Sequence, residues 1–396
     1  MRVAVFTDND FDKINGVTTT WRAVLEEMRT PGSVRIFTAA ETDVEAPDYF
    51  ATASFGVGLP WYREMRAYWP RVRRMLRQLD ADRISVVHLA TPGPVGLAGR
   101  WIAARRRLPV VGSYHTELGE YVRVLSGSPR LGTAFDAYMR WFYRPCASLL
   151  VPSVATAERL AAFDYAPDLR LWPRGVNGER FSPARRSDSW RRTWRVDDRR
   201  PAILYAGRLS AEKGLRVIGD VQRLLHRHAV DHRMIFVGDG PLDLELRRLV
   251  PGAVFTGALP HDQVAIAMAS ADLFLFPSAT DTFGNVVLEA QASGLPVVVS
   301  DRGGPCQQMR PGVTGTVCPA GDATAFAGAV LELVRDPSRR RAVAAAARDY
   351  AVGRSWAAAT APLRAAWADA QTAAALARRP ADPTRARVSA TAPRAS

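Results

Sequence analysis

Short apolar runs alternate with glycine turns and amphipathic stretches along most of the chain. The run Val3–Phe6 has the length and composition of a buried strand, and the spacing of apolar residues from Val17 onward predicts a helix. Repetition of this order is typical of a parallel sheet that binds ligands at the carboxyl ends of its strands. We expect further strands at residues 84–88, 109–114, 149–152, 202–205, 234–237, 254–256, 273–276 and 297–300.

The strand–turn–helix order stops near Trp172–Pro183 and begins again at Ala202. We therefore predict an α/β protein with two Rossmann-like domains. A break at Ser355–Trp356 separates a last helix, and the final residues, rich in Ala, Pro, Arg and Thr, have a composition typical of a disordered tail. The expected divisions are residues 1–178 and 184–355 for the two domains, 356–376 for the last helix and 377–396 for the tail.

The 396-residue chain has a formal charge of +14 and contains 47% hydrophobic residues. Its apolar runs stay well short of the ~18 residues that a membrane span needs, and the N-terminus lacks the pattern of a secretion signal. Three cysteines without a CxxC pair argue against a disulfide framework or a zinc site and fit a reducing cytoplasm. The positive charge favours an anionic partner, which leaves nucleic acid, acidic lipid and phosphorylated substrates open.

The most informative stretch is Pro277–Pro305, in which two carboxylates flank the expected start of a short helix. Phe283–Asn285 stands at that start, where unpaired backbone N–H groups and the helix dipole favour an anion such as a diphosphate. Asp281 and Glu289 alone would repel a phosphate. Their presence is explained if each binds hydroxyl groups beside the phosphate, as a nucleotide sugar offers.

The spacing Asp281-x7-Glu289 resembles the E-x7-E signature of the retaining glycosyltransferases of family four, which have the GT-B fold. The first acidic residue of that signature is usually Glu, and here it is Asp. The resemblance covers nearly the whole chain except the tail, and its nearest branch is the bacterial α-mannosyltransferase and sulfoquinovosyl-lipid synthase type. It implies two Rossmann-like domains whose parallel sheets face each other across a cleft, with the last helix crossing back to the first domain.

The resemblance assigns catalytic and binding roles to several charged residues. Glu289 would bind the ribose hydroxyls and Asp281 the hydroxyls of the donor sugar; the alternative for either is an acidic residue that serves the helix dipole. Arg208 and Lys213, in a glycine turn, would hold the donor diphosphate and stabilise the departing nucleoside diphosphate. The alternative there is a solvated basic turn.

Glycine turns and one histidine complete the expected site. His115, at the end of a strand, is assigned to the donor sugar or the acceptor; the alternative is a histidine with a structural hydrogen bond. No other histidine has metal-ligand spacing and the family is metal-independent, so neither a metal nor a cofactor is expected. The nucleotide is expected to contact Asn15, Gly16, Gly238, Gly257, Leu259, Phe283, Gly284, Asn285 and Glu289.

The activity implied by the resemblance is the retaining transfer of a hexose from GDP-hexose or UDP-hexose, with GDP-mannose as the preferred donor. The family is held to use same-face attack, in which the leaving phosphate oxygen deprotonates the acceptor. The expected acceptor is a lipid, glycolipid or glycan at the cytoplasmic face of the membrane.

Two other functions stay open. One is a GT-B epimerase that acts on a UDP-sugar and transfers nothing to an acceptor. The other is a non-catalytic nucleic-acid-binding protein, which would need clustered basic and aromatic surfaces. Much of the excess positive charge lies instead in Tyr62–Leu79 and in the tail from Arg378, so no specific nucleic acid is expected.

The segment Tyr62–Leu79 combines a helical stripe of apolar residues with six arginines and one glutamate. One interpretation is a surface helix with its stripe in the core and its arginines in water. The other is a basic face that docks on anionic lipid, at about 1 kcal/mol per arginine near the surface. Pro70 either kinks this helix or marks its true start. The second interpretation would make the protein peripheral on the inner face of the plasma membrane.

Overall fold

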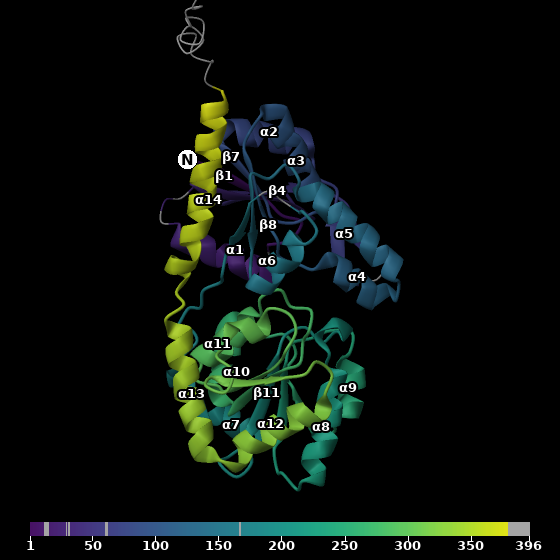
Figure 1. The fold of residues 1–396 in the computed structure, drawn as a ribbon, viewed down its shortest axis with the longest axis vertical. Helices are drawn as coiled ribbons and strands as arrows, with labels where there is room; N and C mark the ends of the chain where they lie inside the picture. Colours follow the sequence, from purple (N-terminus) through teal and green to yellow (C-terminus); the bar gives the residue numbers. More distant parts are fainter. Residues whose placement is uncertain (12–15, 29, 31, 60–61, 166–167, 379–396) are drawn as a thin grey trace, which may run out of the picture.

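The computed structural model describes residues 1–11, 16–28, 30, 32–59, 62–165 and 168–378, which form two parallel sheets flanked by helices (Figure 1). The two sheets belong to two Rossmann-like domains, as the sequence pattern predicts. Both have buried apolar strands, because helices cover the faces of a parallel sheet.

The first sheet is built from strands that precede residue 172. They are β1 (Val3–Phe6), β2 (Val34–Ala40), β3 (Val44–Ala46), β4 (Tyr49–Ala53), β7 (Val86–Leu89), β8 (Val110–Ser113), β9 (Ser148–Val151) and β10 (Leu169–Leu171). Within the described residues these eight strands lie in the order β10-β9-β8-β7-β1-β2-β4-β3. All neighbours are parallel except β3 and β4, which are antiparallel.

The second sheet is parallel throughout. Its strands are β11 (Ala202–Ala206), β12 (Arg233–Val237), β13 (Val254–Phe255), β14 (Leu273–Phe276), β15 (Val297–Ser300) and β16 (Gly315–Cys318). Their order is β13-β12-β11-β14-β15-β16, so the chain reverses direction across the sheet between β11 and β14. A reversal of this kind is where ligands bind in open parallel sheets.

Helices connect the strands of both sheets. Those of the first are α1 (Gly16–Glu27), α2 (Val72–Ala81), α3 (Pro94–Arg106), α4 (Leu118–Ser126), α5 (Pro129–Tyr143) and α6 (Val154–Ala161). Those that follow are η1 (Pro183–Arg185), α7 (Asp188–Trp194), η2 (Ala211–Lys213), α8 (Arg216–Arg227), α9 (Asp243–Leu249), α10 (His261–Ser270), α11 (Asn285–Ala292), η3 (Pro305–Gln308), α12 (Ala323–Arg335), α13 (Pro337–Val352) and α14 (Trp356–Ala377).

The last helix, α14, leaves the second domain and packs on the first sheet (Figure 1). Its residues Leu363 and Trp367 share a buried cluster with Val3 of β1 and Trp21 of α1. The side chain of Ser355 caps the helix by accepting a hydrogen bond from Ala358 N. The chain therefore crosses between the domains twice, and the second crossing brings a tryptophan into the core of the first domain.

The prediction of one helical stripe over Tyr62–Leu79 is wrong in its first half. Tyr62–Tyr68 is a strand, β6, that pairs antiparallel with β5 (Gly56–Leu59). The helix α2 begins only at Val72, so Pro70 marks the end of the strand and the approach to the helix rather than a kink. In α2 the apolar positions Met75 and Leu79 are buried. Residues 379–396 of the expected tail lie outside the described residues.

Candidate active site

Several glycine turns contact one another at the carboxyl edge of the second sheet. Gly207 follows β11 and Gly238 follows β12, with φ angles of 145° and 132°. A Cβ atom on Gly238 would lie 2.1 Å from the carbonyl oxygen of Gly207, so only glycine allows this approach. Gly238 N also donates to Gly257 O over 2.9 Å. These contacts bring the turns of Gly238 and Gly257, both expected to contact the nucleotide, side by side, and Leu259 packs partly buried against the same core.

The start of α11 is held by a second group of glycines. Gly284 is the N-cap with a φ of 84°, and Gly304 N donates to Asp281 O over 2.7 Å. A Cβ atom on Gly304 would lie 2.1 Å from Thr282 O, so the loop before the helix is packed backbone on backbone. The first N–H groups of the helix, those of Asn285 and Val286, have no partner within the helix itself and favour an anion, whereas Val287 N donates to Gly284 O over 2.9 Å.

Lys213 and Asp281 form an ion pair beside this helix start. Lys213 Nζ lies 2.7 Å from Asp281 Oδ1 and 2.9 Å from Oδ2. Ser278 Oγ donates a further short hydrogen bond to Asp281. Burial by itself lowers the pKa of Lys213, but Asp281, Tyr121 and Tyr205 outweigh it, so that pKa stands well above its ordinary value. Two residues that the sequence assigns to different parts of the donor are therefore in direct contact.

Arg208 lies immediately after Gly207, on the same turn as the ion pair. Its side chain is half-buried, and its carbonyl oxygen accepts a hydrogen bond of 2.9 Å from Tyr205 OH. Tyr205 is fully buried in β11, so its hydrogen bond holds the main chain of Arg208 in place just after the strand ends. The turn thus carries two cations, one paired with Asp281 and one at the strand end.

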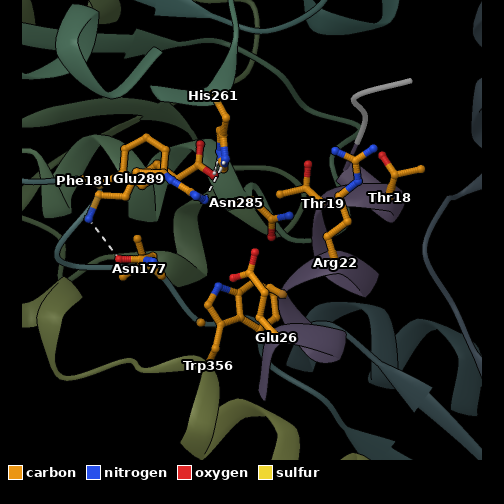
Figure 2. A pocket seen from close by; sticks show the side chains of 14 residues that line it. Thr18, Thr19, Arg22, Glu26, Asn177, Phe181, His261, Asn285, Glu289 and Trp356 are labelled. Carbon is orange, nitrogen blue, oxygen red and sulfur yellow. Dashed lines mark hydrogen bonds and ion pairs between the residues drawn. The ribbon is translucent and has the colours of Figure 1, made fainter. Parts of the chain in front are cut away.

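Glu289 lies inside α11 and faces a cavity of about 170 Å³ between α1 and the second domain (Figure 2). His261 Nε2 lies 3.3 Å from Glu289 Oε1, and Arg180 Nη1 lies 3.4 Å from His261 Nδ1. Sequence reasoning missed His261 and Arg180, because neither belongs to a motif. The cavity is lined by Thr18, Thr19, Arg22, Ala23, Glu26, Gly175, Val176, Asn177, Arg180, Phe181, His261, Asn285, Glu289 and Trp356.

Two of the residues expected to contact the nucleotide, Asn15 and Gly16, belong to the first domain. Gly16 is the first residue of α1, and a Cβ atom there would meet nothing within 4 Å. Asn15 lies outside the described residues. In Figure 2 the carboxylate of Glu26 points toward Asn285, whereas the guanidinium of Arg22 lies beside Thr18 and donates to the carbonyl oxygen of Phe11.

His115 follows β8 and meets the second domain directly. Its carbonyl oxygen accepts a hydrogen bond of 2.9 Å from Thr282 Oγ1, in the loop before α11. His115 Nε2 lies 2.8 Å from Ser113 Oγ, and His115 Nδ1 lies 3.4 Å from Arg174 Nη2. Burial, followed by the charges of Arg174 and His88, holds the pKa of His115 well below its ordinary value, so the imidazole is neutral.

Arg174 is a further residue that sequence reasoning missed. Only 3% of its surface is exposed, and its guanidinium lies 3.9 Å from the ring centre of Trp172 and 6.0 Å from that of Phe283. Among the described residues no carboxylate forms an ion pair with it, and burial lowers its pKa to about 9. It therefore adds positive charge at the contact between His115 and the loop before α11.

The predicted residues fall into two directly bonded groups. Lys213 bonds to Asp281, whose loop reaches His115 through Thr282, while Glu289 bonds to His261 and faces the cavity. Within the parts of the chain described here, no hydrogen bond joins Glu289 to Asp281. The same parts contain no group of three or more His, Cys, Asp or Glu residues arranged to hold a metal ion. None of their helices is both long and apolar enough to cross a membrane.

Comparisons with known proteins agree with this architecture. The family described as Glycosyltransferase Family 4 matches residues 14–180, and Glycosyl transferases group 1 matches residues 200–336. A GDP-mannose-dependent alpha-mannosyltransferase of Mycobacterium tuberculosis is 35% identical over 90% of this chain and 93% of its own length. The sulfoquinovosyl transferase SQD2 of Arabidopsis thaliana is 30% identical over 92% of this chain and 72% of its own. Sucrose-phosphate synthase from Thermosynechococcus elongatus has the same fold, with a TM-score of 0.75 at 20% identity over 94% of this chain and 99% of that one.

Proposed function

The chain belongs to the glycosyltransferases of group 1 and family four, and we propose that it is a retaining, metal-independent mannosyltransferase with GDP-mannose as donor. The observation that carries this proposal is the Lys213–Asp281 pair, placed between the glycine edge of the second sheet and His115. The name of the relative from Mycobacterium tuberculosis supports the choice of donor.

The donor is proposed to lie along the carboxyl edge of the second sheet. Arg208, Lys213 and the N-terminus of α11 would neutralise the diphosphate, and this charge stabilisation grows as the nucleoside diphosphate leaves. Glu289 would bind the ribose and Asp281 the sugar hydroxyls. Because the protein supplies these positive groups itself, we propose that no metal ion is needed.

Retention is proposed to proceed by same-face attack. Both carboxylate oxygens of Asp281 already accept hydrogen bonds from Lys213 and Ser278, which suits a carboxylate that orients hydroxyl groups rather than one that attacks carbon. The bond from the sugar C1 to the phosphate oxygen breaks as the acceptor oxygen bonds to the same face. The acceptor proton then passes to the departing phosphate oxygen, so no protein base is required.

The acceptor is proposed to be a lipid, glycolipid or glycan at the cytoplasmic membrane face. Arg73 and Arg77 are exposed on α2, which begins shortly after Trp69 in the chain; Trp69 and Phe55 are 61% and 68% exposed. The pair is joined through the backbone, since Trp69 N donates to Phe55 O over 3.3 Å. Exposed aromatic residues and exposed arginines in one stretch of the chain suit the interface of an anionic membrane.

The direct test is a transfer assay with radiolabelled GDP-mannose, a bacterial lipid extract and excess EDTA. The proposal predicts labelled lipid or glycan and an α-linked product by NMR. UDP-glucose and UDP-galactose serve as matched donors. A β-linked product, or activity lost with EDTA and restored by a divalent metal, would contradict the proposal, and so would epimerisation of a UDP-sugar without transfer.

A further inference from the structure

A chain of hydrogen bonds leads from the last helix to His115. Trp367 Nε1 donates to His88 Nδ1 over 3.0 Å, and His88 Nε2 lies 2.8 Å from Ser113 Oγ. The same hydroxyl oxygen lies 2.8 Å from His115 Nε2. Trp367, His88 and Ser113 are buried, whereas His115 keeps part of its surface exposed. The chain therefore connects the protein core with the edge of the site.

The direction of the first bond is fixed by chemistry. An indole N–H can only donate, so His88 Nδ1 must accept. A neutral His88 then carries its proton on Nε2 and donates it to Ser113 Oγ. Burial, with a smaller contribution from Arg174, lowers the pKa of His88 to about 3, so this ring is neutral in ordinary buffers.

The bond from His88 to Ser113 also determines the donor in the next hydrogen bond, between Ser113 and His115. Because its oxygen accepts from His88, its own hydrogen is free to be donated to His115 Nε2, and the proton of His115 then sits on Nδ1. The opposite arrangement would leave the buried Ser113 hydroxyl without an acceptor among the described residues. In return it would gain only the 3.4 Å contact from Arg174 Nη2 to His115 Nδ1, which is at the outer limit of hydrogen-bond length.

We propose that Trp367 and His88 are positioning residues that fix the Nδ1–H tautomer of His115 and thereby make it a hydrogen-bond donor to a substrate oxygen. In this tautomer the 3.4 Å contact between Arg174 Nη2 and His115 Nδ1 is no longer a hydrogen bond but places two N–H donors side by side, and a substrate oxygen that accepts from both would relieve this. That oxygen is a sugar hydroxyl or a phosphate oxygen. In this role His115 is not a general base. The effect on turnover rests on the proposed function, whereas the tautomer itself does not.

A matched control lies in the same aromatic cluster. The ring of Trp21 is 4.9 Å from that of His88 and 6.5 Å from that of Trp367. Trp21 is fully buried like Trp367, but its Nε1 has no hydrogen-bond partner among the described residues. Trp21→Phe therefore loses similar packing without touching the hydrogen-bond chain, and Trp367→Phe loses both.

The tautomer is measured directly by ¹⁵N NMR of histidine side chains, because protonated and unprotonated ring nitrogens have well-separated resonances. The chain has six histidines, and His115→Gln identifies the relevant signals. We expect a protonated Nδ1 in the wild type and in Trp21→Phe. We expect Trp367→Phe and Ser113→Ala to shift the proton toward Nε2. A wild-type His115 protonated on Nε2, or an Nδ1–H tautomer that survives both substitutions, would overturn the proposal.

Kinetics and binding then test the consequence. Trp367→Phe should lower kcat about tenfold, the rate equivalent of one hydrogen bond, while Trp21→Phe changes kcat less than about twofold. His88→Gln, whose amide can accept from Trp367 and donate to Ser113, should restore most of the rate that His88→Leu loses. Equal losses in Trp367→Phe and Trp21→Phe would reduce the chain to a packing role and overturn the proposal.

The source of the oxygen follows from titrations of Trp367→Phe with GDP and with GDP-mannose. Weaker binding of both identifies a phosphate oxygen, and weaker binding of GDP-mannose alone identifies a sugar hydroxyl. Either outcome supports His115 as a donor. A protein that shows the expected tautomer but transfers no mannose supports the inference about Trp367 and His88, and counts against the proposed function instead.

Discussion

Lys213 and Asp281 are 68 positions apart in the sequence, yet Lys213 Nζ lies within 2.9 Å of both carboxylate oxygens of Asp281. The pair is mostly buried, with side-chain exposures of 13% and 21%. Each residue therefore holds the other in place before any substrate binds. The charge of Lys213 is also partly neutralised in this state, so a bound diphosphate competes with Asp281 for the ammonium group.

Removing the charge of Asp281 should separate its role from that of Lys213. We expect Asp281→Asn to lower kcat by at least about tenfold, because the sugar loses a charged hydrogen-bond acceptor. The affinity for GDP should stay equal or rise, since the ammonium of Lys213 becomes free for the diphosphate. Steady-state kinetics and calorimetry measure the two effects. A loss of GDP affinity equal to the loss in kcat would contradict the assignment of Asp281 to the sugar.

Lys213→Ala should weaken GDP binding about tenfold or more and lower kcat, because a cation at the leaving diphosphate is lost. Arg216→Ala is a suitable control, since Arg216 pairs with Glu245 on the exposed surface close by in the sequence. Calorimetric titration of both variants checks the prediction. Unchanged affinity in Lys213→Ala would remove Lys213 from the diphosphate site.

Glu289→Ala should lose turnover while the fold stays intact. If its carboxylate binds the ribose hydroxyls, the substitution should weaken GDP binding about tenfold, and 2′-deoxy-GDP should show a smaller difference between wild type and variant. Glu245, which pairs with Arg216 on the surface of the second domain, offers a control substitution to Ala. The ribose assignment fails if the two nucleotides lose equal affinity on substitution of Glu289.

The buried His88 should make stability depend on pH. Burial lowers its folded pKa from 6.5 to about 3, so below pH 6.5 the unfolded chain binds a proton that the folded protein does not. The contribution of the neutral, buried His88 to the free energy of unfolding is fully present above pH 6.5. It is lost as the pH falls from 6.5 toward 3, by roughly 1.4 kcal/mol per pH unit. Urea unfolding at pH 7.5 and 5.5 measures this loss.

His88→Gln should reduce that pH dependence, whereas His228→Gln, at an exposed histidine, should leave it unchanged. The comparison uses the difference between the two pH values, so a general loss of stability in His88→Gln does not affect it. An equal pH dependence in the wild type and in His88→Gln would show that His88 is protonated in the folded protein.

The membrane proposal predicts that Arg73→Glu combined with Arg77→Glu lowers binding to phosphatidylglycerol vesicles more than about tenfold. Arg74 is left intact, because it pairs with Asp43 and packs over Phe50. Arg227→Glu with Arg341→Glu changes the net charge equally on exposed residues of the second domain. Co-sedimentation measures binding. An equal loss in both double variants would indicate an effect of net charge alone.

The sequence predicts the strands and glycine turns at the carboxyl edge of the second sheet well, because apolar runs and glycines are visible in short stretches of sequence. Gly238 is required by its close approach to the backbone of Gly207, Gly207 itself has a φ of 145° with the Tyr205 hydroxyl close by, and both turns follow buried apolar runs. The sequence pattern predicts a helix where the structure has the strand β6, because Tyr62, Met65 and Tyr68 also fit a helical spacing and the pairing with β5 is not visible in that pattern.

Contacts between segments that are distant in the chain cannot be predicted from the sequence pattern alone. Nothing in the motifs indicated that Lys213 would bond to Asp281, because the pair depends on the neighbouring positions of β11 and β14 in the sheet. The bond from Trp367 to His88 depends in the same way on the return of α14 to the first sheet, across 279 residues. Arg174 stands between the two strand–helix series, where an arginine is usually solvated, and only the packing of the folded chain shows that it is buried.

The central claim is a nucleoside diphosphate site on the second domain that works without metal. Calorimetric titration of the purified protein with GDP, UDP and ADP in the presence of EDTA tests it most directly. We predict that GDP binds, and that it binds at least about tenfold more tightly than UDP or ADP. If folded protein binds none of the three, the proposed roles of Arg208, Lys213 and Glu289 are wrong.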